Sequence, residues 1–133
     1  MISDIKIVEM MEVVCRCLDD EIVEVREMAA TTLSGILRVS PRRSVLALKD
    51  RFTRLAKHST LPKKSSPKYN AALRQRHAAV LGICALIDSY PYTIESWMPP
   101  LMTDVLVEYT YDPVSGHLYT SQVLFLRRRT TDL

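Results

Sequence analysis

The stretch DEIVEVREMAATTLSGIL, residues 20–37, decides the fold class of this chain. Its apolar and small side chains return at steps of three and four residues, which places them on one face of an α-helix. We therefore predict a helix over residues 22–39. Its inward face is expected to carry Val25, Ala29, Leu33, Ile36 and Leu37.

A second stretch, RHAAVLGICALI at residues 76–87, repeats this pattern. Counted from Arg26 and from Arg76, small or apolar residues recur at +3, +4, +7, +9, +10 and +11. The arginines are 50 residues apart, and removing about ten residues for a loop leaves roughly 40, a period typical of HEAT-type helix pairs. The first copy resembles the HEAT consensus. We interpret this repeat signature as structural, and its residues are Asp20, Val25, Arg26, Ala29, Leu33, Arg76, Ala79 and Ile83.

The sequence around these two stretches continues as helices joined by short turns. We predict further helices over residues 3–18, 40–56, 71–89 and 97–109. Ser3 and Asn70 are expected to cap the first and third of these, and Ser40-Pro41 to start the second. The apolar face of the first is expected to carry Ile5, Val8, Met11, Cys15 and Leu18.

The predicted fold is all-α, with antiparallel helix pairs of a HEAT-like α-solenoid and about five helices. We place this helical segment at residues 1–113 and an irregular or divergent tail at 114–133. Residues 58–70, HSTLPKKSSPKYN, break the periodicity and are expected to form an exposed loop. That loop is either a solvated insertion or a basic docking segment, tunable by phosphorylation at Ser66, with Lys63, Lys64 and Lys68 as its candidate contacts.

Composition excludes several function classes. The hydrophobic fraction of 47% and the charged fraction of 25% are ordinary for a globular domain. A formal charge of +3 is too small to imply nucleic acid without a focused patch. The longest uncharged apolar run, residues 78–87, is shorter than the roughly 20 residues that cross a bilayer. We expect a soluble intracellular chain with neither membrane nor nucleic acid as partner.

No pattern of catalytic or metal-binding residues stands out. The chain has three glycines, three histidines and three cysteines: Gly35, Gly82, Gly116, His58, His77, His117, Cys15, Cys17 and Cys84. The glycines are too far apart for a phosphate-binding loop, and the histidines and cysteines lack metal-ligand spacing. We expect no enzyme activity, catalytic residue, cofactor, metal or small-molecule substrate.

A more specific pattern lies in RQRHAAVLGICALIDSYPYTIESWMPPLMTDVLVEYTYDP, residues 74–113. The order R-H-A-x-V-L-G, S-x-P-Y, W-M-P-x-L and D-P resembles the C-terminal region of the large single-chain HEAT-repeat proteasome activators, the proteasome activator subunit 4 family. The stretch Leu61-Pro62-Lys63-Lys64 resembles an L-P-K-K segment that precedes it there. The resemblance covers residues 23–113, and Trp97-Met98-Pro99 is its most specific part.

The resemblance implies a binding function. Members of that family are α-solenoid shells that cap the 20S proteasome core, promote ATP-independent peptide hydrolysis and recognise acetylated histones through a bromodomain-like C-terminal region. It therefore implies the 20S core and acetylated histones as partners, a link to DNA repair, and a location in nucleus and cytoplasm.

The tail departs from the family pattern. After Pro113 the family continues with helical sequence and a terminal hydrophobic-Tyr-x motif, whereas this chain reads VSGHLYTSQVLFLRRRTTDL. We therefore expect a chain that is truncated or divergent after Pro113 and does not open the proteasome gate alone. Two alternatives stay open: a generic HEAT-repeat interaction scaffold, and a nucleic-acid-binding module that uses residues 57–68 and the arginines at 127–129.

Overall fold

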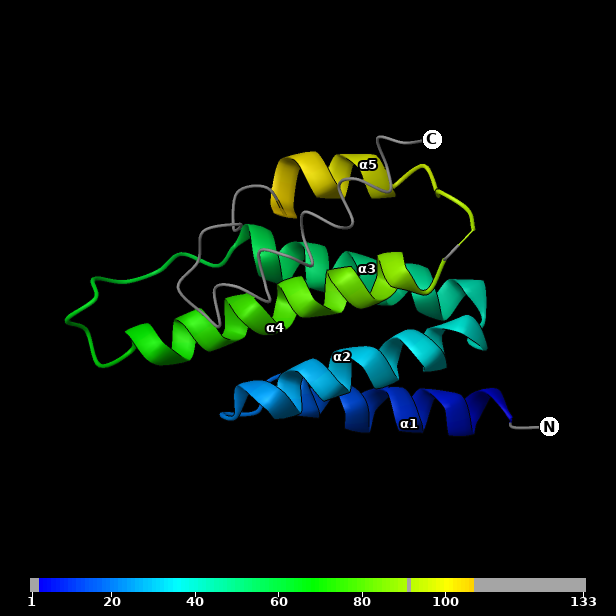
Figure 1. The fold of residues 1–133 in the computed structure, drawn as a ribbon, viewed down its shortest axis with the longest axis horizontal. Coiled ribbons are helices and arrows are strands. Elements are labelled where there is room, and N and C mark those ends of the chain that lie inside the picture. The colour runs from blue at the N-terminus through cyan, green and yellow to red at the C-terminus, as the bar shows by residue number, and fades with distance from the viewer. Residues whose placement is uncertain (1–2, 91, 107–133) are drawn as a thin grey trace.

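The computed structural model describes residues 3–90 and 92–106, and every regular element in these ranges is a helix (Figure 1). The elements are α1 (Asp4–Cys17), α2 (Val23–Arg38), α3 (Arg42–Lys57), α4 (Tyr69–Asp88), α5 (Met98–Leu101) and a π-helical turn, η1 (Met102–Leu106). The predicted all-α fold is confirmed. The expected fifth helix is short in the described part of the chain, and the predicted tail lies outside the described residues.

The helices lie side by side in layers. α1 pairs with α2, α2 packs on α4, and α4 packs on α3, with α5 and η1 on the far side of α3 (Figure 1). α4 is the central helix, because every residue from His77 to Ile87 is buried. Its neighbours supply the rest of one continuous core, including Leu33 from α2 and Phe52 from α3.

A side-chain cap marks the start of α1, whereas α3 and α4 begin without one. The Ser3 side chain accepts a hydrogen bond from the Lys6 N–H at 3.4 Å, so the predicted cap of α1 is confirmed. The Ser40 hydroxyl instead donates to the Ile36 carbonyl at 2.7 Å, and α3 starts after Pro41. α4 begins at Tyr69 without a side-chain cap, so the expected capping role of Asn70 is wrong.

The expected inward face of α1 is partly wrong. Met11, Cys15 and Leu18 are buried as predicted, but Ile7 takes the place of Ile5 and Val8. Ile5 is 73% exposed and Val8 is 43% exposed. α1 carries apolar residues on more than one side, and Ile7 lies four residues from Met11 and eight from Cys15, in line with both on the helix surface.

Candidate functional site

The first copy of the repeat signature builds the turn between α1 and α2. The Asp20 carboxylate accepts a hydrogen bond from the Ile22 N–H at 2.9 Å, which fixes the chain just before α2. Arg26 lies in the first turns of α2 and is only 4% exposed, and no ion pair joins it to Asp20 in the described residues. Its Nε and Nη1 atoms find no hydrogen-bond acceptor in the described structure. Burial lowers the pKa of Arg26, and the charge of Arg74 lowers it further.

Three signature residues on α2 separate into two environments. Ala29 and Leu33 are buried in the core, as predicted. Val25, which was expected on the same inward face, is only partly buried. It lines an outer groove of about 380 Å³ between α1 and α2, together with Val14, Cys17, Glu24, Met28, Ala29 and Thr32.

The second copy of the signature ties α3 to α4. Arg76 donates through Nε to the Ser59 hydroxyl at 3.2 Å and through Nη2 to the Ser59 carbonyl at 2.6 Å. Ala79 and Ile83 follow on the same helix and are buried in the core. Arg76 thus holds the segment that leaves α3 against the first turns of α4.

The predicted basic loop is exposed and projects beyond the ends of the helices (Figure 1). Lys63, Lys64 and Lys68 all have exposed side chains. The Ser66 N–H donates to the Lys63 carbonyl at 2.8 Å, and the Ser66 hydroxyl accepts from the Lys68 N–H at 3.2 Å. The three lysines therefore lie in a hydrogen-bonded turn that directly precedes α4.

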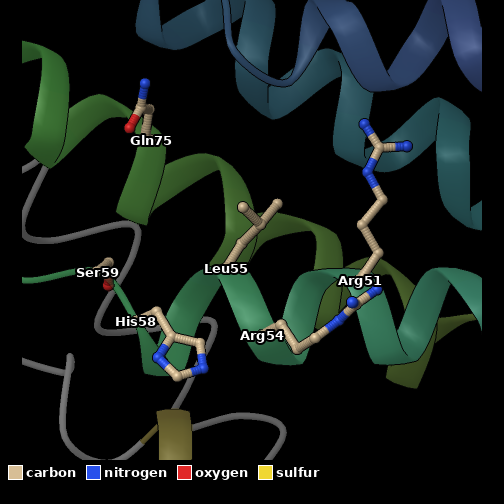
Figure 2. Close-up of a pocket in the computed structure, with 6 residues that line it drawn as sticks. All are labelled: Arg51, Arg54, Leu55, His58, Ser59 and Gln75. Carbon is tan, nitrogen blue, oxygen red and sulfur yellow. The ribbon is translucent and has the colours of Figure 1, made fainter.

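A groove opens beside this loop, at the C-terminal end of α3. Its volume is about 360 Å³, and α3 lines it with residues spaced i, i+3, i+4 and i+7, which share one helix face. Figure 2 shows Leu55 on this face between Arg51 and His58. The full lining is Arg51, Arg54, Leu55, His58, Ser59 and Gln75.

The groove has an apolar centre and a cationic edge. Leu55 is 51% exposed there. Arg51 forms an ion pair with Glu12 of α1 at 3.4 Å, whereas Arg54 donates through Nε only to the Asp50 carbonyl, also at 3.4 Å. Within the described residues no carboxylate forms an ion pair with Arg54.

Charge is divided unevenly along the chain. Residues 1–41 contain eight Asp and Glu against four Lys and Arg, a formal charge of −4. Residues 42–76 contain eleven Lys and Arg against one Asp, a formal charge of +10. The small net charge of the whole chain conceals this basic segment. Its positive charge is evident only when charges are summed over shorter stretches of the sequence.

Ion pairs neutralise only part of the basic segment. Arg42 forms a two-pronged pair with Glu95 at 3.0 and 3.1 Å, which lowers the pKa of the Glu95 carboxyl. Arg74 pairs with Asp19 at 3.2 Å. Within residues 42–76, five cations at the C-terminal end of α3 or in the loop form no ion pair with the described residues: Arg54, Lys57, Lys63, Lys64 and Lys68.

The buried titratable groups are suited to packing rather than chemistry. Burial lowers the pKa of His77 to about 4, and the charge of Arg26 contributes. Burial raises the pKa of Cys15 to about 11 and that of Cys84 to about 12, so both thiols stay protonated. Within residues 3–90 and 92–106, no cluster of His, Cys, Asp and Glu could hold a metal ion, and no helix is long and apolar enough to cross a membrane.

The Trp97 segment forms a small aromatic cluster next to α5. The rings of Tyr90 and Trp97 lie edge to face, with centroids 6.1 Å apart. Both side chains pack against the core, and Met98 is fully buried. The W-M-P stretch therefore holds the linker after α4 against the helical layers.

Comparisons with known proteins give one consistent result. The family described as proteasome activator complex subunit 4-like, C-terminal, matches residues 73–127, a range that continues past Pro113. Proteasome activator complex subunit 4B of Danio rerio is 42% identical over 126 residues, covering 89% of this chain and 6% of the relative. Subunit 4A of the same fish is 40% identical over 139 residues, covering 98% and 7%. Subunit 4 of Homo sapiens is 38% identical over 121 residues, covering 85% and 6%.

These relatives are far longer than the chain described here, which spans about 7% of their length. No solved structure matches the chain. The similarity therefore extends over most of this sequence but over a small part of each relative.

Proposed function

The chain belongs to the proteasome activator complex subunit 4 family, in its C-terminal region, and on that basis we propose that it is a non-catalytic segment that binds the 20S proteasome core. The observation that carries this proposal is 38–42% identity to members of the family over 85–98% of this chain. Layered helices with exposed outer faces suit protein contacts, because each face is broad and rigid.

In the full family context, we propose that this region helps to promote ATP-independent peptide hydrolysis by the core and to recognise acetylated histones. The chain would act in the nucleus and the cytoplasm, with DNA repair among its processes. These roles rest on family membership rather than on any single residue of the structure.

The proposal is tested with purified 20S core. The chain is captured on beads next to a variant whose end is replaced by a hydrophobic-Tyr-x tail, and core binding and peptide hydrolysis are measured for both. We expect the tailed variant to bind and to raise hydrolysis. If neither version retains the core, the generic interaction scaffold becomes the better interpretation.

Histone recognition needs a separate experiment. Matched histone-tail peptides, acetylated and unmodified at lysine, are titrated into the labelled chain. Preference for the acetylated peptide supports the proposal, whereas equal affinity for both means that this segment does not read acetylation. Imaging of the fluorescently tagged chain in cells tests the proposed location.

A further inference from the structure

The groove beside Leu55 opens at the end of α3 from which the lysine-bearing loop leaves. The groove and the loop together are named the basic groove. It consists of Arg51, Arg54, Leu55 and Lys57 on α3, His58, Ser59 and Gln75 at the groove wall, and Lys63, Lys64 and Lys68 on the loop. Arg76 fixes its wall through two hydrogen bonds to Ser59. The surface is thus held in shape before any ligand arrives.

We propose that the basic groove binds an acidic peptide segment that places one apolar side chain against Leu55. Charge complementarity identifies this occupant, because five cations of the groove and loop form no ion pair with the described residues. A cation without a carboxylate partner contributes to the attraction of an anionic ligand and to its rate of association.

The centre of the groove distinguishes a peptide from nucleic acid. Nucleic acid is usually bound through phosphate contacts together with aromatic side chains on which bases stack. Among the described residues, the groove lining holds no Phe, Tyr or Trp. It offers instead the half-exposed Leu55. An apolar side chain that covers Leu55 removes apolar surface from water, and this favours binding. An acidic peptide with an apolar residue can pair its carboxylates with the cationic edge of the groove and pack its apolar side chain on Leu55 at the centre.

Acidic residues from the N-terminal part of the chain neutralise some basic residues of the segment 42–76 and not others. Glu12 and Asp19 reach across to Arg51 and Arg74, at 3.4 and 3.2 Å. Glu12 of α1 and Asp19 in the turn between α1 and α2 therefore neutralise part of the basic segment. Arg54 and the loop lysines lie beyond their reach, so this end of the molecule keeps its positive charge.

The test uses the full chain and fluorescence anisotropy. The probe is a short labelled peptide of Asp and Glu around a single Leu, and a second probe carries Ser in place of that Leu. A single-stranded DNA oligonucleotide of equal charge is the competing ligand. We expect the Leu peptide to bind most tightly, with a Kd that rises as salt is added.

Two substitutions on one helix separate a specific groove from general attraction. Arg54→Glu reverses a charge in the groove and should raise the Kd for the Leu peptide about tenfold. Arg43→Glu makes the same change in the first turn of α3, where Arg43 is exposed and pairs with Asp4 at 3.7 Å. We expect it to change the Kd by less than about twofold. Equal weakening by both variants would overturn the proposal.

Leu55→Ser tests the apolar contact directly. It should weaken the Leu peptide about fivefold and leave the Ser peptide unchanged, because the loss depends on both apolar partners. Lys63→Glu combined with Lys64→Glu, in a loop outside the helices, should weaken both peptides without altering helical content by circular dichroism. Absence of peptide binding, or tighter binding of the oligonucleotide with no effect of Leu55→Ser, would reject an acidic peptide as the occupant.

Discussion

The ring of Phe52 in α3 lies directly against the backbone of α4 at Gly82. A Cβ placed on Gly82 would stand 2.5 Å from Cε2 of that ring, closer than carbon atoms approach in folded proteins. Phe52 is 4% exposed, and the close packing of a protein core restricts the movement of such a ring. The absence of a side chain at Gly82 therefore sets how closely the two helices pack.

We predict that Gly82→Ala lowers the free energy of unfolding. Overpacking of a closed core costs about 1–3 kcal/mol, which exceeds the gain of about 1 kcal/mol from the better helix propensity of alanine. Gly35→Ala in α2 is the matched control, because a Cβ there meets nothing within 4 Å. That variant should gain about 0.5–1 kcal/mol. Urea unfolding of both variants decides, and a Gly82→Ala protein as stable as Gly35→Ala would contradict the packing seen between Phe52 and Gly82.

A second prediction concerns the contact of Arg76 with Ser59. Arg76→Ala removes both hydrogen bonds to Ser59 and should destabilise the chain by about 1.5–3 kcal/mol. Ser59→Ala removes the hydroxyl, which accepts from Arg76 Nε and donates to the Ala56 carbonyl at 2.6 Å, and should cost about 0.5–1.5 kcal/mol. Unfolding in urea measures both values. A larger loss for Ser59→Ala than for Arg76→Ala would contradict the expectation that the Arg76 guanidinium supplies most of the stability of this contact.

The helical layers could be predicted from the sequence because the strongest pattern lies where burial is most complete. The helical spacing of apolar residues that follows Arg76 corresponds to α4, which is buried from His77 to Ile87. The inward face of α1 is harder to predict, since apolar residues lie on several of its sides. Only the position of α2 determines that Ile7 is buried and Ile5 is exposed. Helix starts at Tyr69 and Arg42 also depend on how the chain enters the stack rather than on a capping residue.

The basic groove was only partly predictable. The loop lysines were found because they interrupt a helical pattern, whereas Arg54 and Leu55 lie inside one. Its spacing of three residues from the buried Phe52 would place Leu55 on the inward face of α3, yet Leu55 is half-exposed beside the groove. Whether it is covered depends on where α4 crosses α3, which no local pattern specifies. The pairing of Arg51 with Glu12 is likewise a result of tertiary packing.

His77 gives a pH-dependent prediction. Its pKa is about 4 in the folded chain and 6.5 as the ordinary value, so between these values the unfolded chain binds a proton that the folded chain does not. Stability should therefore be retained above about pH 6.5 and fall as the pH drops towards 4, by about 2–3 kcal/mol in total. His77→Gln should remove this part of the loss, whereas His58→Gln, at an exposed position, should not. Urea midpoints at several pH values test the difference, and parallel curves for wild type and His77→Gln would contradict it.

The cysteines give the last prediction, because the fold separates them by exposure. Cys15 and Cys84 are buried, and burial raises their pKa values to about 11 and about 12, so very little thiolate forms near neutral pH. Cys17 lies only two residues from Cys15 but is partly exposed at the outer groove. Iodoacetamide should therefore modify Cys17 at least about tenfold faster than the other two. Mass spectrometry of peptides taken at successive times measures the three rates. In concentrated urea the rates should converge, since unfolding removes the burial that protects Cys15 and Cys84, and unequal rates that persist in urea would point to sequence rather than burial as the cause.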